Sequence, residues 1–221
     1  RETVLNFFEQ LQKHFPTLQN FYSREPGEYV LEGKKENGAY RWATVEPKRV
    51  CAGYVNPSSL EAAITQNRTI AELLPYFLSI SPIDCESFNI MFGFDFTYRG
   101  NHNALVAEAL GVPAAFEKLT EYPSNNMINY EPSFQFAFDD KCQTQIRLKI
   151  ETRTGALQVK TGDYGEEQFS VFLTASHIGS LPPGSTYVNI YTDLLNQCQE
   201  LMDHYVIENV LVPLQQAIAI K

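Results

Sequence analysis

The residues best suited to chemistry gather at one corner of the chain, between an alternating stretch and the start of a predicted helix. A histidine can act near neutral pH as an acid, a base or a ligand, and a guanidinium fork suits a phosphate or a carboxylate. Free N–H groups at a helix start also favour an anion. The corner therefore predicts a site for a small anion, with binding residues Arg99, Asn101, His102 and Tyr98, and with His102 or Asp95 as acid or base.

The same residues also have a structural interpretation. Either Asn101 or Asn103 can cap the helix that follows, and Arg99 can lie in solvent or pair with Asp95. We favour this interpretation, because the spacing contains no motif beyond local capping. The two alternatives differ in geometry, since an enzyme needs His102, Asp95 and Arg99 to converge on a concave pocket.

Catalytic and metal-binding motifs are missing from the rest of the sequence. The chain has no G-x-S-x-G, P-loop or G-x-G-x-x-G pattern, and its four histidines lie far apart. The cysteines at 51, 85, 142 and 198 have neither metal-knuckle nor redox spacing. Cys85 lies between Asp84 and Glu86, a setting that opposes formation of a reactive thiolate. The sequence predicts no metal and no cofactor, and it leaves enzymatic activity open.

An alternating strand and a short helix must position the corner. Residues 87–98 alternate strictly between an aromatic, apolar face and a mostly polar face, which is the period of a strand with one face in a core. A helix is predicted from about 102 to 110, because Gly-Val-Pro follows it as a stop signal. Residues 114–120 are expected to form another short helix, and residues 122–131 a loop.

Hydrophobic periodicity predicts the other elements. Helical spacing indicates helices at 2–14, 58–67, 70–78 and from 185 into the 210s. Alternation indicates strands at 29–34, 39–45, 49–55, 134–138, 142–154, 157–160 and 169–176. Asn37-Gly38 supplies the positive φ angles of a tight hairpin turn, Asp139 begins a turn, and Pro213 should bend or end the last helix.

This order of elements favours an α+β fold with an antiparallel meander, helices packed on one face of the sheet, and a long C-terminal helix. The regular β-α-β alternation of a parallel sheet is missing from the second half. A helix-grip arrangement, with a curved sheet around the long helix, is a variant of the same order. We expect a single domain over residues 1–221, and any subdivision into an N-terminal α/hairpin/α part and a C-terminal β-rich part to fall near 80–86.

Composition and charge limit the partners. The 221 residues are 44% hydrophobic and 13% aromatic, which is the composition of a globular chain. The formal net charge of −9 and the scattered Lys and Arg residues disfavour nucleic acids and anionic membranes. No apolar run has the length of a membrane span, and no signal peptide is visible. The cysteine pattern predicts reduced thiols in the cytoplasm.

Together these features favour a soluble, acidic, cytoplasmic α+β protein that acts as a non-catalytic binding or protein-interaction domain. It would bind through a sheet face, a cavity or the corner at 95–103. The apolar stripes of the first and last helices could also support a homodimer or a protein partner. The alternative is an enzyme or binding protein for a small anionic metabolite at the same corner.

Overall fold

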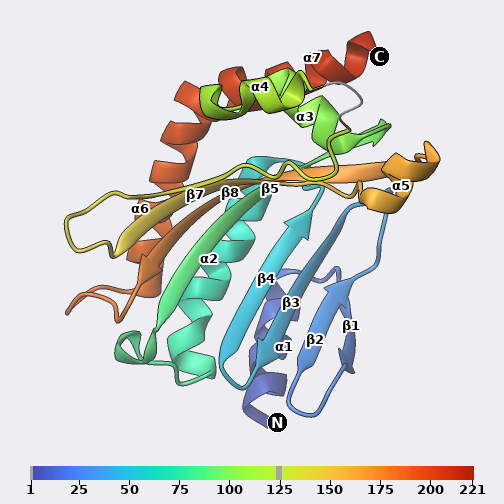
Figure 1. The fold of residues 1–221 in the computed structure, drawn as a ribbon. Coiled ribbons are helices and arrows are strands. Elements are labelled where there is room, and N and C mark those ends of the chain that lie inside the picture. The colour runs from blue at the N-terminus through green and yellow to red at the C-terminus, as the bar shows by residue number, and fades with distance from the viewer. Residues whose placement is uncertain (1, 123–125) are drawn as a thin grey trace. The chain divides into compact units, whose positions relative to one another are not determined.

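The computed structural model describes residues 2–122 and 126–221 (Figure 1). The chain divides into two compact units, one formed by residues 1–86 and 180–191 and the other by residues 87–179 and 192–221. Each unit has a four-stranded antiparallel sheet. The α+β class with antiparallel strands is therefore confirmed, and the N-terminal hairpin belongs to a sheet of its own.

Along the chain, the first unit consists of a helix, a four-stranded meander and a second helix. Its elements are α1 (Glu2–His14), β1 (Leu18–Ser23), β2 (Tyr29–Gly33), β3 (Tyr40–Glu46), β4 (Arg49–Val55), α2 (Leu60–Phe77) and the 3-10 turn η1 (Pro82–Asp84). The strands pair in sequence order, each antiparallel to the next. The turn between β2 and β3 has φ of 51° at Asn37 and 80° at Gly38, as the Asn-Gly pair predicts.

α2 corrects one prediction. The sequence indicated two helices, at 58–67 and 70–78, but α2 is continuous and Ser59 caps it by accepting a hydrogen bond from the Ala62 N–H. The helix continues through Arg68-Thr69 because Ile70 and Leu74 extend its buried stripe across that point. Tertiary burial here outweighs the weak local break.

The segment 180–191 belongs to this first unit. The Tyr187 hydroxyl donates to the Ser81 carbonyl at 2.9 Å, and the Tyr191 hydroxyl donates to the Ile64 carbonyl at 3.4 Å. Burial raises the pKa of both phenols to about 12. The two tyrosines thus tie the start of the last helix to the start of η1 and to α2.

The second unit contains the corner. Its elements are β5 (Ser87–Arg99), α3 (His102–Leu110), η2 (Ala114–Phe116), α4 (Glu117–Thr120), β6 (Ser133–Ala137), β7 (Thr144–Glu151), α5 (Ala156–Thr161) and β8 (Glu166–Ile178). The strand order is β5-β8-β7-β6, so β8 and β7 are the inner strands and β5 and β6 are the edges. Of the predicted loop at 122–131, residues 123–125 lie outside the described residues.

α5 corrects the strand predicted at 157–160. Gly155 donates its N–H to Gln158 Oε1 at 2.9 Å, and Gly162 ends the helix with φ of 69° and an N–H bond to the Gln158 carbonyl. Four residues are too few for alternation to separate a strand from one helical turn.

The long C-terminal helix is confirmed. It runs as α6 (Tyr187–Leu201), the π-helical stretch η3 (Met202–Leu211) and α7 (Val212–Ile220). Pro213 does not end it, because it falls in the first turn of α7, where the preceding π-helical bonding already changes the hydrogen-bond pattern.

The core of the second unit lies on one face of its sheet. Phe169, Val171, Leu173 and Ala175 of β8 are fully buried, and α3, α4 and α7 lie over that face (Figure 1). Leu105 from α3 and Leu214 from α7 are also fully buried. The corner therefore stands where β5 leaves this sheet and α3 begins to cover it.

Candidate functional site

The start of α3 is capped by the protein itself. Asn101 Oδ1 accepts the N–H groups of Asn103 and Ala104, at 3.0 and 3.2 Å. His102 donates its N–H to Thr154 Oγ1 at 3.0 Å, and Leu105 donates to the Asn101 carbonyl at 3.0 Å. The amides that the anion hypothesis uses are thus occupied, as the capping interpretation predicts.

His102 is buried, with 1% of its surface exposed. Its Nε2 lies 3.1 Å from the Tyr98 carbonyl, and its Nδ1 lies 3.3 Å from the Arg153 amide nitrogen. Because an amide N–H can only donate and a carbonyl can only accept, Nδ1 is the acceptor and Nε2 carries the proton. The ring also packs against Phe169, with centroids 5.3 Å apart. Both nitrogens of His102 therefore serve to join three segments of backbone.

The structure does not bring His102 together with Asp95 and Arg99. Asp95 Oδ1 accepts the Ser170 hydroxyl at 2.6 Å, and Arg99 Nε donates to the Tyr164 carbonyl at 3.2 Å. Both side chains are exposed and belong to the odd-numbered row of β5. His102 lies against Phe169, which is in the core on the opposite face of the sheet.

Tyr98 and the glycine at 100 shape the corner sterically. A Cβ atom at Gly100 would lie only 2.5 to 2.7 Å from three atoms at the far end of the Tyr98 side chain, so a larger residue at this position would require Tyr98 to move. The Tyr98 ring is 6.2 Å from the ring of His102. Tyr98 therefore packs on the inner side of the corner, whereas Arg99 extends outward.

The side chain of Asn103 joins three segments of the chain, and the sequence showed this residue only as a candidate cap. It is fully buried. Its Nδ2 donates to the carbonyls of Ile128 and Thr154, at 3.2 and 3.0 Å. Its Oδ1 accepts the Tyr130 N–H and the Thr152 hydroxyl, both at 2.8 Å. One side chain thus holds α3 against the chain before β6 and the chain after β7.

The first unit has a polar cluster of its own around Arg41. Its Nη1 donates to Gln66 Oε1 at 2.6 Å, and Gln66 Nε2 donates to the Gly53 carbonyl at 2.9 Å. The guanidinium carbon lies 4.9 Å from the Phe15 ring centroid and 3.9 Å from that of Tyr54. Desolvation lowers the pKa of Arg41. The cluster joins α2 to β3 and β4, which is a structural role.

A different feature distinguishes β6. Phe134, Phe136 and Phe138 share the face of Ile146, which is buried on the neighbouring strand, yet these phenylalanines are 56%, 61% and 54% exposed. Such alternation of aromatic residues is the pattern of a strand with one face in a core. These phenylalanines are exposed because β6 is the last strand of the sheet, and every residue of β6 is exposed.

The backbone of β6 also has an open edge. Phe138 donates its N–H to the Thr144 carbonyl at 2.8 Å, and the Pro132 carbonyl accepts the Ile150 N–H at 3.0 Å. Hydrogen-bonded residues alternate along an antiparallel pair, so the even-numbered residues bond to β7. The N–H and C=O groups of Ser133, Gln135 and Ala137 point outward, and no residue in 2–122 or 126–221 bonds to them.

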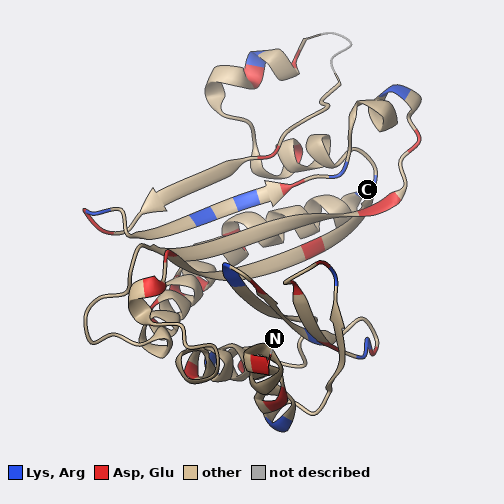
Figure 2. Cartoon of the chain, turned by 90° about the horizontal axis from the view of Figure 1, so that it is seen from below, with Lys and Arg blue, Asp and Glu red and all other residues tan. Residues whose placement is uncertain are grey.

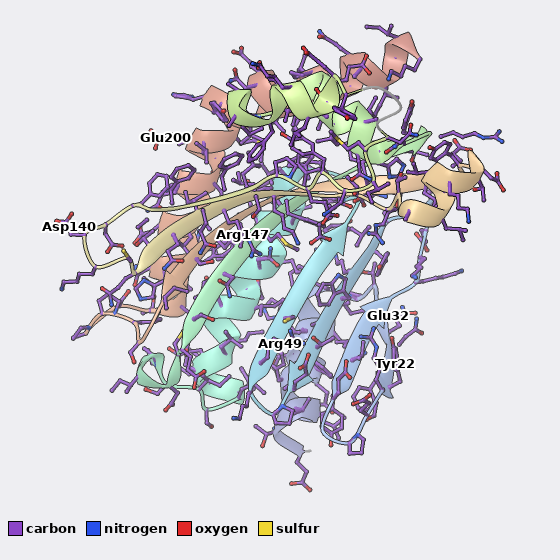
Figure 3. All side chains as sticks on the ribbon, in the orientation of Figure 1. Tyr22, Glu32, Arg49, Asp140, Arg147 and Glu200 are labelled. Atoms are coloured by element: carbon purple, nitrogen blue, oxygen red, sulfur yellow. The ribbon has the colours of Figure 1, made fainter. Side chains whose placement is uncertain are left out.

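Charge is distributed unevenly across these two strands. β6 is the uncharged outermost strand of its sheet, and β7 beside it carries basic residues (Figure 2). Arg147 lies on β7, in register with Gln135, and Asp140 lies in the turn between the two strands (Figure 3). Lys149 forms an ion pair with Glu151 at 2.7 Å. The residues of β6 are therefore uncharged, and charged residues flank the strand at Glu131 and Asp139.

The turn before β7 fixes the register of β6. The Asp139 carboxylate accepts the N–H groups of Thr144, Gln143 and Lys141, and the bonds from Thr144 and Gln143 lower the pKa of Asp139. The predicted turn at 139–141 is confirmed. Because the turn is anchored by three bonds, the outward groups of β6 are held in a defined position.

Comparisons of the chain with protein family models, with curated proteins and with solved structures find no match. Among the described residues, His, Cys, Asp and Glu side chains form no group of three or more that could hold a metal ion. In the same part of the chain, no helix has both the length and the apolar character to cross a bilayer.

Proposed function

We propose that this chain is a non-catalytic protein-interaction domain and that the edge strand β6 is its binding surface. The observation that carries the proposal is the combination of an exposed phenylalanine row with an unpaired backbone edge on one strand. An added strand binds through main-chain hydrogen bonds and takes its specificity from alternate side chains. β6 offers both.

Exposed aromatic rows and open strand edges are both features that proteins normally cover. A free edge invites pairing with another chain, and natural sheets protect it with charges, proline or bulges. Ser133–Ala137 contains none of these. Aromatic side chains are also enriched where proteins bind each other. A partner that adds a strand to β6 would cover the edge and part of the row together.

The proposal includes the acidic, cytoplasmic character expected from the composition. All four cysteines lie in the described part of the chain, and none of them forms a disulfide. Burial raises the pKa of the Cys198 thiol to about 11, which keeps this group protonated and unreactive at neutral pH. Reduced thiols of this kind support a cytoplasmic location.

Site-specific photocrosslinking tests the binding surface. We expect full-length chain with p-benzoylphenylalanine in place of Phe136 to form a covalent adduct of higher mass when cells that express it are irradiated. The matched control replaces Leu157 on α5, which is 72% exposed but outside β6. Labelling should be several-fold stronger at 136. Equal labelling at the two positions, or none at either, would contradict the proposal.

The alternative function is binding or turnover of a small anionic metabolite at the corner 95–103. Its support is the exposed guanidinium of Arg99, whose Nε has a backbone carbonyl as its partner. Against it stand the occupied amides of α3 and the separation of His102 from Asp95 and Arg99 by the sheet. These contacts favour a structural role for the corner.

Thermal unfolding with sulfate, phosphate, nucleotides and small carboxylates separates the two functions. A specific ligand at about 100 times its dissociation constant stabilises by about 2.7 kcal/mol, which shifts Tm by several degrees. We expect each anion to change the Tm of wild type and the Tm of Arg99→Ala equally, because the α3 amides have no free donor for an anion. A shift that is present in wild type and lost in Arg99→Ala would support the anion site.

A further inference from the structure

We propose that the occupant of the β6 edge is β6 of a second copy of this chain. The two strands would pair antiparallel about a two-fold axis at Gln135 and join the two sheets into one. The inference rests on the proposed function, because it names the partner of the same surface. Three observations carry it: the spacing of the outward groups, the placement of the phenylalanines, and the lack of charge on the residues Ser133–Ala137 of β6.

The outward backbone groups of β6 are complementary to themselves. Ser133, Gln135 and Ala137 are evenly spaced, with Gln135 at the centre. When Gln135 faces the partner's Gln135 in a hydrogen-bonded pair, Ser133 faces the partner's Ala137 in another such pair. Every outward N–H then meets a carbonyl and every outward carbonyl meets an N–H. The symmetry of a two-fold dimer is thus already present in the strand.

The side chains suit the same register. Phe134 would face the partner's Phe136 in a non-hydrogen-bonded pair, where Cα atoms are about 4.5 Å apart and side chains lie closest. Aromatic pairs in this position stabilise an antiparallel sheet. Because opposite residues share a face, the exposed rows of the two copies would form one continuous aromatic surface. The partner covers the edge and also pairs the exposed phenylalanines of β6.

Charge explains why the pairing would occur at β6. Two copies with a formal net charge of −9 each repel one another, so contact is favoured where charge is lowest. β6 has no charged residue. By contrast, the edge strand β5 carries Asp95 and Arg99, and the edge strand β1 has a register shift between Leu18 and Asn20. Charges and bulges are devices that prevent edge pairing.

The mass of the purified full chain in solution tests the inference. We expect wild type to sediment, at tens of micromolar, with twice the chain mass of 25.1 kDa. Gln135→Lys would place two lysines directly opposite each other, with Cα atoms about 5.5 Å apart, and like charges so placed are destabilising. The dissociation constant should rise by about tenfold or more, which corresponds to at least about 1.4 kcal/mol.

The control variant is Gln168→Lys. It makes the same chemical change at an exposed position of the same sheet, on β8, and it should leave the dimer intact. Circular dichroism and thermal unfolding of both variants establish that they are folded. Equal weakening of the dimer by the two substitutions would show that general charge, and not the β6 edge, controls association, and would overturn the inference.

Hydrogen exchange of single amides tests the register. The N–H groups of Phe136 and Phe138 face β7 and should be protected at every concentration. Those of Ser133, Gln135 and Ala137 should become protected only as the dimer forms. A dimer in which the outward amides still exchange would be built on another surface, such as a helix stripe, and would overturn the inference.

The two proposals can fail separately. A strictly monomeric wild-type chain overturns the second copy as the occupant. If p-benzoylphenylalanine at 136 nevertheless crosslinks to a different protein, the interaction function stands with another partner. If the chain is monomeric and position 136 gives no adduct, both proposals are wrong.

Discussion

Replacing Asn103 with alanine is expected to lower the free energy of unfolding by about 3 kcal/mol. The side chain is fully buried and uses both of its donors and both lone pairs of its oxygen. Alanine leaves the Tyr130 N–H and the Thr154 carbonyl without these partners, and an unpaired buried polar group costs more than a hydrogen bond gains. Three segments would lose their common anchor.

Urea unfolding followed by circular dichroism measures this loss. The matched control is Asn209→Ala on η3, where the side chain is exposed and its Nδ2 donates to the Tyr205 carbonyl at 2.9 Å. We expect the control to stay within about 0.5 kcal/mol of wild type. Equal losses of folding free energy in the two variants would mean that the buried hydrogen bonds of Asn103 stabilise the fold no more than the exposed hydrogen bond of Asn209.

The isosteric variant Asn103→Asp separates hydrogen bonding from packing. It keeps the volume of the side chain and both acceptors but removes the two donors that face the Ile128 and Thr154 carbonyls. Its carboxylate would then point at two carbonyl oxygens in a buried site, so we expect a loss at least as large as that of Asn103→Ala. A smaller loss in Asn103→Asp would mean that Asn103→Ala destabilises the protein mainly through the cavity that it leaves.

Elements with a long, regular period could be predicted from the sequence. β5 alternates over its whole length, and the predicted strand at 87–98 falls one residue short of the observed end at Arg99. Asn37-Gly38 specified its hairpin turn because few other pairs accept two positive φ angles. In both cases the information is local, since the pleat and the turn depend only on neighbouring residues.

Elements whose form depends on residues far away in the chain could not be predicted from the sequence. The four residues 157–160 fit one helical turn as well as a short strand, and the surrounding caps determine which forms. α2 passes through a local break because its buried face continues beyond it. The order β5-β8-β7-β6 places β5 beside β8, which is far from it in the chain, and no sequence period encodes strand order.

The same dependence on distant residues explains why the role of the corner residues could not be predicted from the sequence. His102 and Asn103 have the residue types of a reactive centre, but their partners at 130, 152, 153 and 154 lie 27 to 52 positions away in the chain. Their burial therefore cannot be read from the neighbouring sequence. Conversely, Phe134 and Phe136 alternate as a core strand does. Their exposure follows from the edge position of β6, which only the sheet order determines.

Replacing Phe169 with alanine is expected to lower the free energy of unfolding by about 3–5 kcal/mol. Phe169 is fully buried near the start of β8, with its ring 5.4 Å from the ring of Phe96 and 5.3 Å from that of His102. Alanine removes this contact area and leaves a cavity that the two long strands cannot readily close. The loss is measured by urea unfolding at a concentration low enough to keep the chain monomeric.

Phe136→Ala is the matched control, because it makes the same truncation on the same face of the same sheet. The Phe136 side chain is 61% exposed, so little apolar surface leaves water when the monomer folds, and we expect a loss below about 1 kcal/mol. The effect of Phe136→Ala should instead appear in the dissociation constant of the dimer. Equal losses of folding stability at 136 and 169 would mean that both rings are buried in the monomer core, which would remove the exposed row on which the proposed binding surface depends.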